Sequence, residues 1–161
     1  MDEIFRKPES DKRFLDDIDR KIIEMLLENS RMSYVDMGRE LGMTRVAVSE
    51  RVKALQDRGV IEGFTVTLNL QKIGKPISAF FSIDVETYSF DAIATNLAED
   101  PNVVSVYQMT GPSTLHVHAV LEDMGALEKF ISERLYSVKG IKTVESQILL
   151  RRFKSRGGVR P

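Results

Sequence analysis

Residues 33–59, SYVDMGRELGMTRVAVSERVKALQDRG, determine the fold of the N-terminal third of this chain. Ser33 and Thr44 are residues of the kind that cap helix N-termini, because their hydroxyls accept hydrogen bonds from free N–H groups. Gly42 can adopt positive φ at no steric cost and predicts a turn. Gly38, a poor helix former, predicts a close helix–helix crossing. A short helix, a turn of about three residues and a second capped helix are typical of a helix-turn-helix.

The second of these helices has two faces of different chemistry. Val48, Val52 and Leu55 recur at helical spacing and predict the face that packs on the other helices. The opposite face is polar and cationic, and such a face can reach base edges in the major groove while flanking basic groups hold phosphates. The sequence therefore predicts DNA contacts for Thr44, Arg45, Val46, Ser49, Glu50, Arg51, Lys53 and Arg31. Of these, Arg51 and Arg31 are expected to contact phosphates or to pack within the domain.

The residues on either side extend this motif into a small domain. Asp16 and the acidic residues after it open a first helix, since acids favour a helix N-terminus, and Asn29 closes it. The apolar stripe of this helix is Ile18, Ile22, Met25 and Leu26. After Gly59, the alternation in residues 60–68 predicts a small β-hairpin. Three helices followed by a hairpin predict a winged helix-turn-helix.

The remaining chain alternates between strand and helix patterns. Residues 71–76 are polar and carry a glycine and a proline, which predicts a hinge. Strands are expected at 77–85, 103–109, 115–121 and 141–150, and helices at 89–99 and 124–135. The order β-α-β-β-α-β predicts an antiparallel sheet with both helices on one face. The expected fold class is α+β, with an N-terminal winged helix-turn-helix and a C-terminal ferredoxin-like βαββαβ domain.

The predicted sheet has helices on one face only, yet its strands are apolar at adjacent positions. Residues 79–81 (AFF) and 148–150 (ILL) are examples. A strand that is apolar on both faces needs a second partner. We therefore expect the open face to pack on another copy of the chain, as a homodimer. Two recognition helices about 34 Å apart would then contact successive major grooves of a roughly palindromic site.

Composition excludes several classes of protein. The chain has no cysteine, which rules out disulfides and thiolate metal sites and fits a cytoplasmic location. It has no apolar run near the about 20 residues that a membrane helix needs, and its charged N-terminus is no secretory signal. Because no nucleophile constellation or phosphate loop occurs, we expect neither enzyme activity nor a cofactor. The net charge of −1 means that DNA affinity must come from local charge.

Two local features have more than one interpretation. His116 and His118 lie on one face of a strand and could bind a metal with Glu122, but histidines at a subunit interface or beneath a loop are more common, and we expect no metal. The C-terminal tail is basic, and it either stays solvated or adds phosphate contacts. Its basic residues are Arg151, Arg152, Lys154, Arg156 and Arg160.

These motifs resemble the Lrp/AsnC (leucine-responsive, or feast/famine) transcription regulators. The matching segments are LDDIDRKII at 15–23, NSR at 29–31, ELGMT at 40–44, VSERV at 48–52 and GVIEGF at 59–64. In the second half the strand order and Thr110-Gly111 match. The resemblance implies a winged helix-turn-helix, a hinge strand, and an effector-binding domain that dimerises through its sheet. It also implies that dimers assemble further into tetramers or octamers.

The resemblance implies an effector site as well. Small effectors, typically amino acids, bind between dimers near the loop that joins the second and third strands. In this chain that loop is Gln108, Met109, Thr110, Gly111, Pro112, Ser113 and Thr114. Many family members carry an aromatic and an acidic residue shortly after the glycine, where this chain has Ser113-Thr114. A hydroxyl cannot supply the charge that pairs with an ammonium, so a different effector, or none, stays open.

The predicted organisation and function follow. The expected regions are a DNA-binding domain at 1–63, a hinge at 64–75, an effector-binding and oligomerisation domain at 76–153, and a basic tail at 154–161. The expected function is that of a sequence-specific DNA-binding transcription regulator, dimeric or of higher order, modulated by a small molecule. The alternative is a small-molecule-binding or scaffolding protein that does not read DNA.

Overall fold

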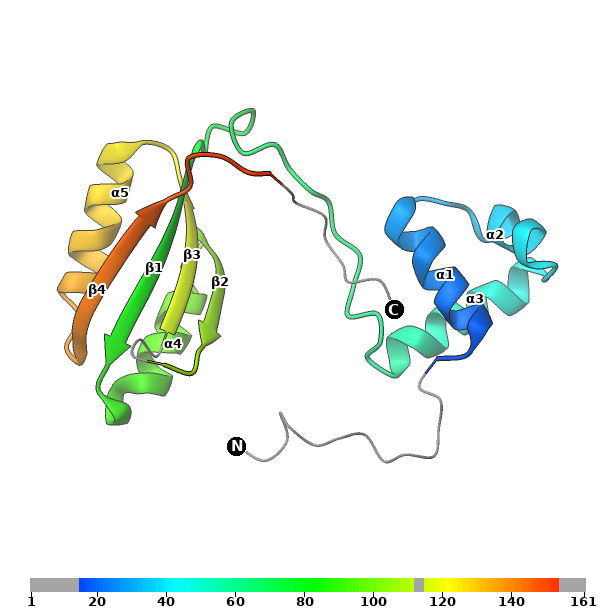
Figure 1. Ribbon diagram of the computed structural model, residues 1–161, viewed down its shortest axis with the longest axis horizontal. Helices are drawn as coiled ribbons and strands as arrows, with labels where there is room; N and C mark the ends of the chain where they lie inside the picture. The colour runs from blue at the N-terminus through cyan, green and yellow to red at the C-terminus, as the bar shows by residue number, and fades with distance from the viewer. Residues whose placement is uncertain (1–14, 112–114, 154–161) are drawn as a thin grey trace. The chain divides into compact units, whose positions relative to one another are not determined.

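The computed structural model describes residues 15–111 and 115–153. The chain divides into two compact units between Val66 and Thr67, inside the segment expected to be the hinge (Figure 1). Each unit has its own hydrophobic core. The predicted basic tail at 154–161 lies outside the described residues. Within the described ranges, no helix is long and apolar enough to span a membrane.

Three helices form the first unit, and each begins directly after the residue that was predicted to open it. They are α1 (Asp17–Glu28), α2 (Tyr34–Leu41) and α3 (Arg45–Asp57). The side chains of Asp16, Ser33 and Thr44 accept hydrogen bonds from backbone N–H groups in the first turns, at 2.7, 3.1 and 3.2 Å. The caps fix where each helix starts because they satisfy donors that have no partner within the helix. The core of the unit consists of Ile22, Leu26, Met37, Val48, Val52 and Leu55.

The turn between α2 and α3 has little room. Gly42 adopts the left-handed conformation at φ 66° and ends α2. The N–H of Met43 donates to the carbonyl of Gly38 at 2.8 Å. A Cβ atom on Gly38 would lie 2.5 Å from the carbonyl oxygen of Met43. The close approach expected at Gly38 is therefore present, but its neighbour is the turn itself rather than a second helix.

The predicted β-hairpin over residues 60–68 is wrong. The N–H groups of Val60 and Ile61 both donate to the carbonyl of Leu55, at 2.9 and 3.1 Å, so this segment caps the end of α3. Residues 62–69 contain no helix or strand. A hairpin needs two paired strands, and the backbone of the first half is already used for capping. The segment after it, with Phe64, Val66 and Leu68, is solvent-exposed.

The second unit has the predicted ferredoxin-like arrangement. Its strands are β1 (Ile77–Val85), β2 (Val103–Gln108), β3 (Leu115–Leu121) and β4 (Ile141–Ile148), and its helices are α4 (Phe90–Ala98) and α5 (Met124–Phe130). The strands form an antiparallel sheet in the order β2-β3-β1-β4 (Figure 1). A short 3₁₀ turn, η1 (Thr87–Ser89), precedes α4. The last strand ends two residues earlier than expected.

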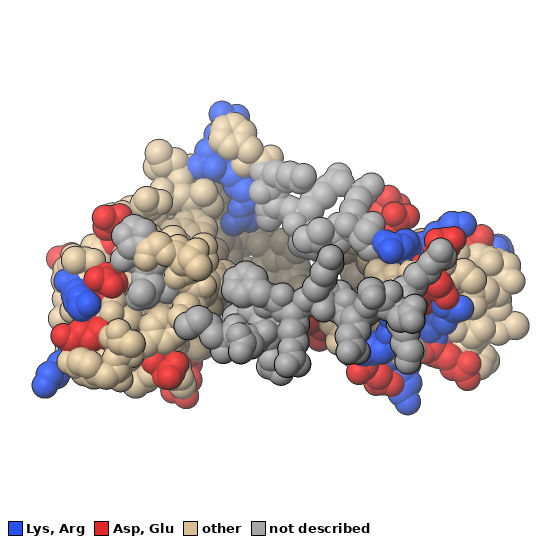
Figure 2. Space-filling model, turned by 60° about the horizontal axis from the view of Figure 1, so that its bottom comes forward, with Lys and Arg blue, Asp and Glu red and all other residues tan. Residues whose placement is uncertain are grey.

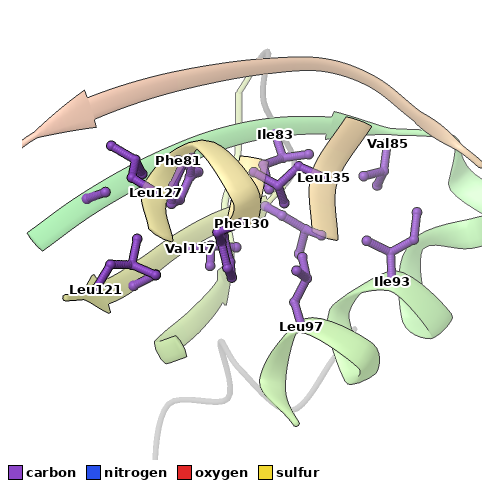
Figure 3. Close-up of a cluster of buried hydrophobic side chains, with 13 residues drawn as sticks. Phe81, Ile83, Val85, Ile93, Leu97, Val117, Leu121, Leu127, Phe130 and Leu135 are labelled. Carbon is purple, nitrogen blue, oxygen red and sulfur yellow. The ribbon is translucent and has the colours of Figure 1, made fainter. Parts of the chain in front are cut away.

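The core of this unit lies between the sheet and its two helices (Figure 3). Phe81 and Ile83 from β1 meet Val117 from β3, and the ring of Phe130 lies 5.5 Å from that of Phe81. The helix predicted to run to residue 135 changes to π-helical winding in η2 (Ile131–Tyr136). Wider winding brings residues five apart closer to one face. Phe130 and Leu135 can therefore both point into the core.

Candidate nucleic-acid interface

Among the residues that the structure describes, the outward side of α3 is largely exposed. Arg45, Val46, Glu50 and Lys53 are exposed, and Ser49 is half-buried. The opposite side is fully buried at Val48, Val52 and Leu55. Helical spacing alone predicted this division of faces. The structure also brings Thr44 to the start of the same surface, where its hydroxyl caps the helix.

Charge on the helical unit is mixed. On the face shown in Figure 2, basic and acidic side chains alternate over this unit. The whole chain has a net charge of −1. A mixed surface gives little long-range attraction to DNA, so selective binding must depend on where individual groups meet the bases.

Arg51 lies at the side of α3, and its charge is paired within the unit. Its Nη1 is 2.6 Å from an Asp16 carboxylate oxygen and 2.8 Å from an Asp19 carboxylate oxygen. Arg58 approaches the other oxygen of Asp19 at 3.5 Å. Asp19 is only 6% exposed. Of the two predicted roles of Arg51, phosphate contact or packing, these distances favour packing, because the guanidinium is already paired with two carboxylates.

Sequence reasoning did not predict this ion-pair network, which joins the start of α1 to α3. Asp16 and Asp19 were interpreted only as residues that favour a helix start. Arg51 is 35 and 32 residues away from them along the chain. The available signal was a pair of acids three residues apart at a helix start, in a domain whose third helix carries a basic flank. That signal does not specify which arginine would pair.

Arg31 is the predicted contact that lies furthest from α3 in the sequence. It is exposed in the segment between α1 and α2, where its backbone N–H donates to the side-chain oxygen of Asn29 at 3.1 Å. It lines a shallow hollow together with Leu26, Ser30, Met32, Ser33, Tyr34 and Phe64. An exposed guanidinium next to the start of α2 has the chemistry to contact a phosphate.

We expect the helical unit to lose stability as the pH falls, partly through Asp16. The N–H of Asp19 and the guanidinium of Arg51 hold the pKa of Asp16 below its ordinary value of 3.8. A carboxylate with a lowered folded-state pKa stabilises the fold above its unfolded pKa, and this contribution is lost as the pH falls through the folded pKa. Hydrogen exchange over α1–α3, measured from about pH 7 to about pH 3, should show the loss.

Asp16→Asn removes the negative charge and keeps the N-cap of α1, because asparagine is an equally good N-cap residue. The variant should be less stable than the wild type near neutral pH and should lose less stability on acidification. Asp17→Asn, one residue further along, is the matched control and should keep the wild-type pH dependence. Equal pH dependence of Asp16→Asn and the wild type would contradict this assignment.

The open face of the sheet carries both polar and apolar side chains. Phe80 is 42% exposed, and its ring stacks on His118 with 4.3 Å between centroids. Nε2 of His118 is 2.8 Å from Oγ of Ser78. Burial, and to a lesser extent the charge of Arg152, lowers the pKa of His118. The expected second apolar face is thus reduced to a few side chains among polar ones.

The metal-binding alternative receives no support from this geometry. His116 and His118 are on the same side of β3, as predicted, and lie opposite Ser82 and Phe80 of β1. Within the described part of the chain, no three His, Cys, Asp or Glu side chains come together as a metal site would require.

The predicted effector loop is only partly described. Gln108 ends β2, and Leu115 begins β3. Met109, Thr110 and Gly111 follow Gln108, and all four are exposed, with Gly111 at φ 125°. Pro112, Ser113 and Thr114 lie outside the described residues. The described part is an exposed turn at the end of two neighbouring strands.

Comparison with known proteins agrees with both units. Residues 15–56 match the AsnC-type helix-turn-helix domain, and residues 78–159 match the Lrp/AsnC ligand-binding domain. The HTH-type transcriptional regulator PH0140 of Pyrococcus horikoshii is 35% identical over 142 residues, which cover 88% of this chain and 90% of that protein. The HTH-type transcriptional regulator Ptr1 of Methanocaldococcus jannaschii is 33% identical over 140 residues, which cover 87% of this chain and 95% of that protein.

A solved structure shows the same fold. The complex of the transcriptional regulator NMB0573 from Neisseria meningitidis with L-Met superposes with a TM-score of 0.84 at 24% identity, over 90% of this chain and 96% of that one. The two domain matches, the relatives and the arrangement of three helices before a βαββαβ sheet all agree. The chain therefore belongs to the Lrp/AsnC family of DNA-binding transcription regulators.

Proposed function

We propose that this chain regulates transcription in the cytoplasm by binding specific DNA sites as a homodimer or higher oligomer, under control of a small-molecule effector. The observation that carries the proposal is the surface of α3. Its N-terminal turn is fixed by Thr44, and its outward side chains are exposed and chemically varied. A rigid helix with a free, mixed face fits the major groove.

The residues of this surface have different proposed roles. Arg45 begins the helix and would donate two hydrogen bonds to a guanine. Ser49 and Lys53 follow along the same side and would contact bases or position the backbone. Arg31 would bind a phosphate. Arg51 acts as a positioning residue, since its pairing with Asp16 fixes α3 against α1.

The proposed dimer uses the open face of the sheet. Phe80 and its stacked partner His118 lie at the centre of a face that α4 and α5 do not cover. Residues 62–69 support the same proposal, because Phe64, Val66 and Leu68 alternate along an extended segment and are exposed. Among the described residues this segment pairs with no strand, and its exposed apolar side chains are suited to pairing with a second copy.

The effector is proposed to bind at the loop from Gln108 to Thr114. The structure of the Neisseria regulator is a complex with L-Met, which makes amino acids the first class to test. Ser113 and Thr114 offer hydroxyls and no carboxylate. A thermal-shift screen of amino acids would find an effector, because a ligand stabilises the fold once its concentration exceeds the dissociation constant.

The dimer and its DNA binding can be tested together with Phe80→Asp. The substitution removes the aromatic ring that would pack on the partner copy and puts there a carboxylate that must lose its water on association, so we expect monomers in sedimentation velocity. Affinity for a DNA site with two half-sites should fall by at least about ten-fold, since the two DNA-binding domains are no longer joined in one dimer. The probe is the DNA upstream of the protein's own gene, or a duplex selected from random sequence.

Tyr136→Asp is the matched control, because Tyr136 is an exposed aromatic residue on the helical side of the same unit. This variant should sediment and bind as the wild type does. An unchanged mass for Phe80→Asp would reject the proposed dimer face. Equal binding of the wild type to all duplexes would reject specific reading and favour a small-molecule-binding or scaffolding protein.

A further inference from the structure

Within the described residues, Val46 does not belong to the core that holds α3 in place. It is 60% exposed, and in α3, all of which the structure describes, it is the only large hydrophobic side chain that is exposed. The core side of the helix is filled by Val48, Val52 and Leu55. A β-branched residue also loses side-chain freedom in a helix, and at Val46 no burial compensates for this loss.

Exposure alone does not indicate a functional role for Val46, since single exposed apolar side chains are common on protein surfaces. The position of Val46 is more informative. It is in the first helical turn, directly after Arg45, and Ser49 and Glu50 follow one turn later on the same side. Side chains in this turn of a recognition helix are the ones that reach base edges.

The major groove offers one apolar group to such a side chain. Hydrogen-bond donors and acceptors mark the other edges, whereas thymine presents a C5 methyl group. Building on the proposed function, we propose that Val46 is a specificity-determining residue that selects thymine by contact with this methyl. Arg45 and Glu50 are polar neighbours suited to guanine and to the cytosine amino group, so neither can supply this contact.

The DNA itself provides the test, with wild-type protein throughout. Each thymine of the preferred duplex is replaced in turn by deoxyuridine, which removes the methyl and nothing else. We expect the replacement to lower the affinity about four-fold at one position in each half-site, which corresponds to the loss of one buried methyl group. Replacing both of these thymines in one duplex should lower the affinity about fifteen-fold. Placing 5-methylcytosine where cytosine has replaced that thymine should restore part of the binding.

Val46→Ala assigns the effect to this residue. In that variant, which lacks the two methyl groups of the valine, replacing thymine by deoxyuridine at the sensitive position should lower the affinity much less than in the wild type. Val35→Ala is the matched control, since Val35 is a half-exposed valine of α2, and it should keep the wild-type sensitivity. Equal circular dichroism spectra and equal affinity for unrelated DNA verify that both variants are folded.

The outcomes separate this inference from the function on which it rests. Specific binding in which no deoxyuridine matters, or in which Val46→Ala keeps the full deoxyuridine effect, overturns the role of Val46 and leaves specific DNA reading intact. If the wild-type protein binds every duplex with the same affinity, both the role of Val46 and the proposed sequence-specific DNA binding are overturned.

Discussion

Replacing Arg45 with alanine is expected to weaken binding to the preferred DNA site by about 1–3 kcal/mol for each half-site, or about 5- to 150-fold. Arg45 is exposed at the first position of α3, behind the Thr44 cap. An arginine there can donate two hydrogen bonds to guanine, which no shorter side chain replaces. A dimer on two half-sites would lose about twice that free energy.

Comparison of specific with unrelated DNA shows whether the contact is to a base. Titrations at one fixed salt concentration should show the loss on the preferred duplex and little change on the unrelated one, because base contacts carry specificity and phosphate contacts do not. Arg20→Ala, which removes an exposed arginine of α1, should match the wild type on both. Unchanged affinity of Arg45→Ala for the preferred duplex would exclude Arg45 from the reading surface.

The second large effect concerns Asp19→Ala, which should destabilise the helical unit. Asp19 is the buried acceptor of both Arg51 and Arg58. Removal of one partner from a buried ion pair costs about 3–5 kcal/mol. We expect about 2 kcal/mol here, since the two arginine side chains are 33% and 41% exposed and can return to water.

Hydrogen exchange over α1–α3 measures this loss within the helical unit. Asp17→Ala is the matched control, because Asp17 is an exposed acid in the same turn, and it should cost little. In the Asp19→Ala background, Arg51→Ala should cost less than it does in the wild type, which is the signature of coupling. Equal stability of Asp19→Ala and Asp17→Ala would show that the network does not hold the unit together.

Much of the fold could be predicted because its signals are local. The starts of α1, α2 and α3 were evident from Asp16, Ser33 and Thr44, whose side chains act within three residues. The strands β1 and β3 have the predicted bounds, since runs rich in β-branched residues end at clear turns. The order of the elements then determined the ferredoxin-like topology.

The errors arise where distant or competing contacts decide. The hairpin failed because Val60 and Ile61 cap α3, a use of the backbone that alternation of side chains cannot reveal. The π-helical winding of η2 depends on how Phe130 and Leu135 meet the sheet. The pairing of Arg51 with Asp16 and Asp19 joins residues more than thirty positions apart, so the sequence predicted the residue and not its partner.

Methylation protection by dimethyl sulfate tests the central claim, that the outward side of α3 lies in the major groove of DNA. This reagent methylates guanine N7 in the major groove and adenine N3 in the minor groove. With wild-type protein on its preferred duplex, guanine N7 should be protected in two patches about one helical turn apart, the spacing expected for two α3 helices. Protection confined to adenine N3, with guanine N7 fully reactive across the site, would contradict it.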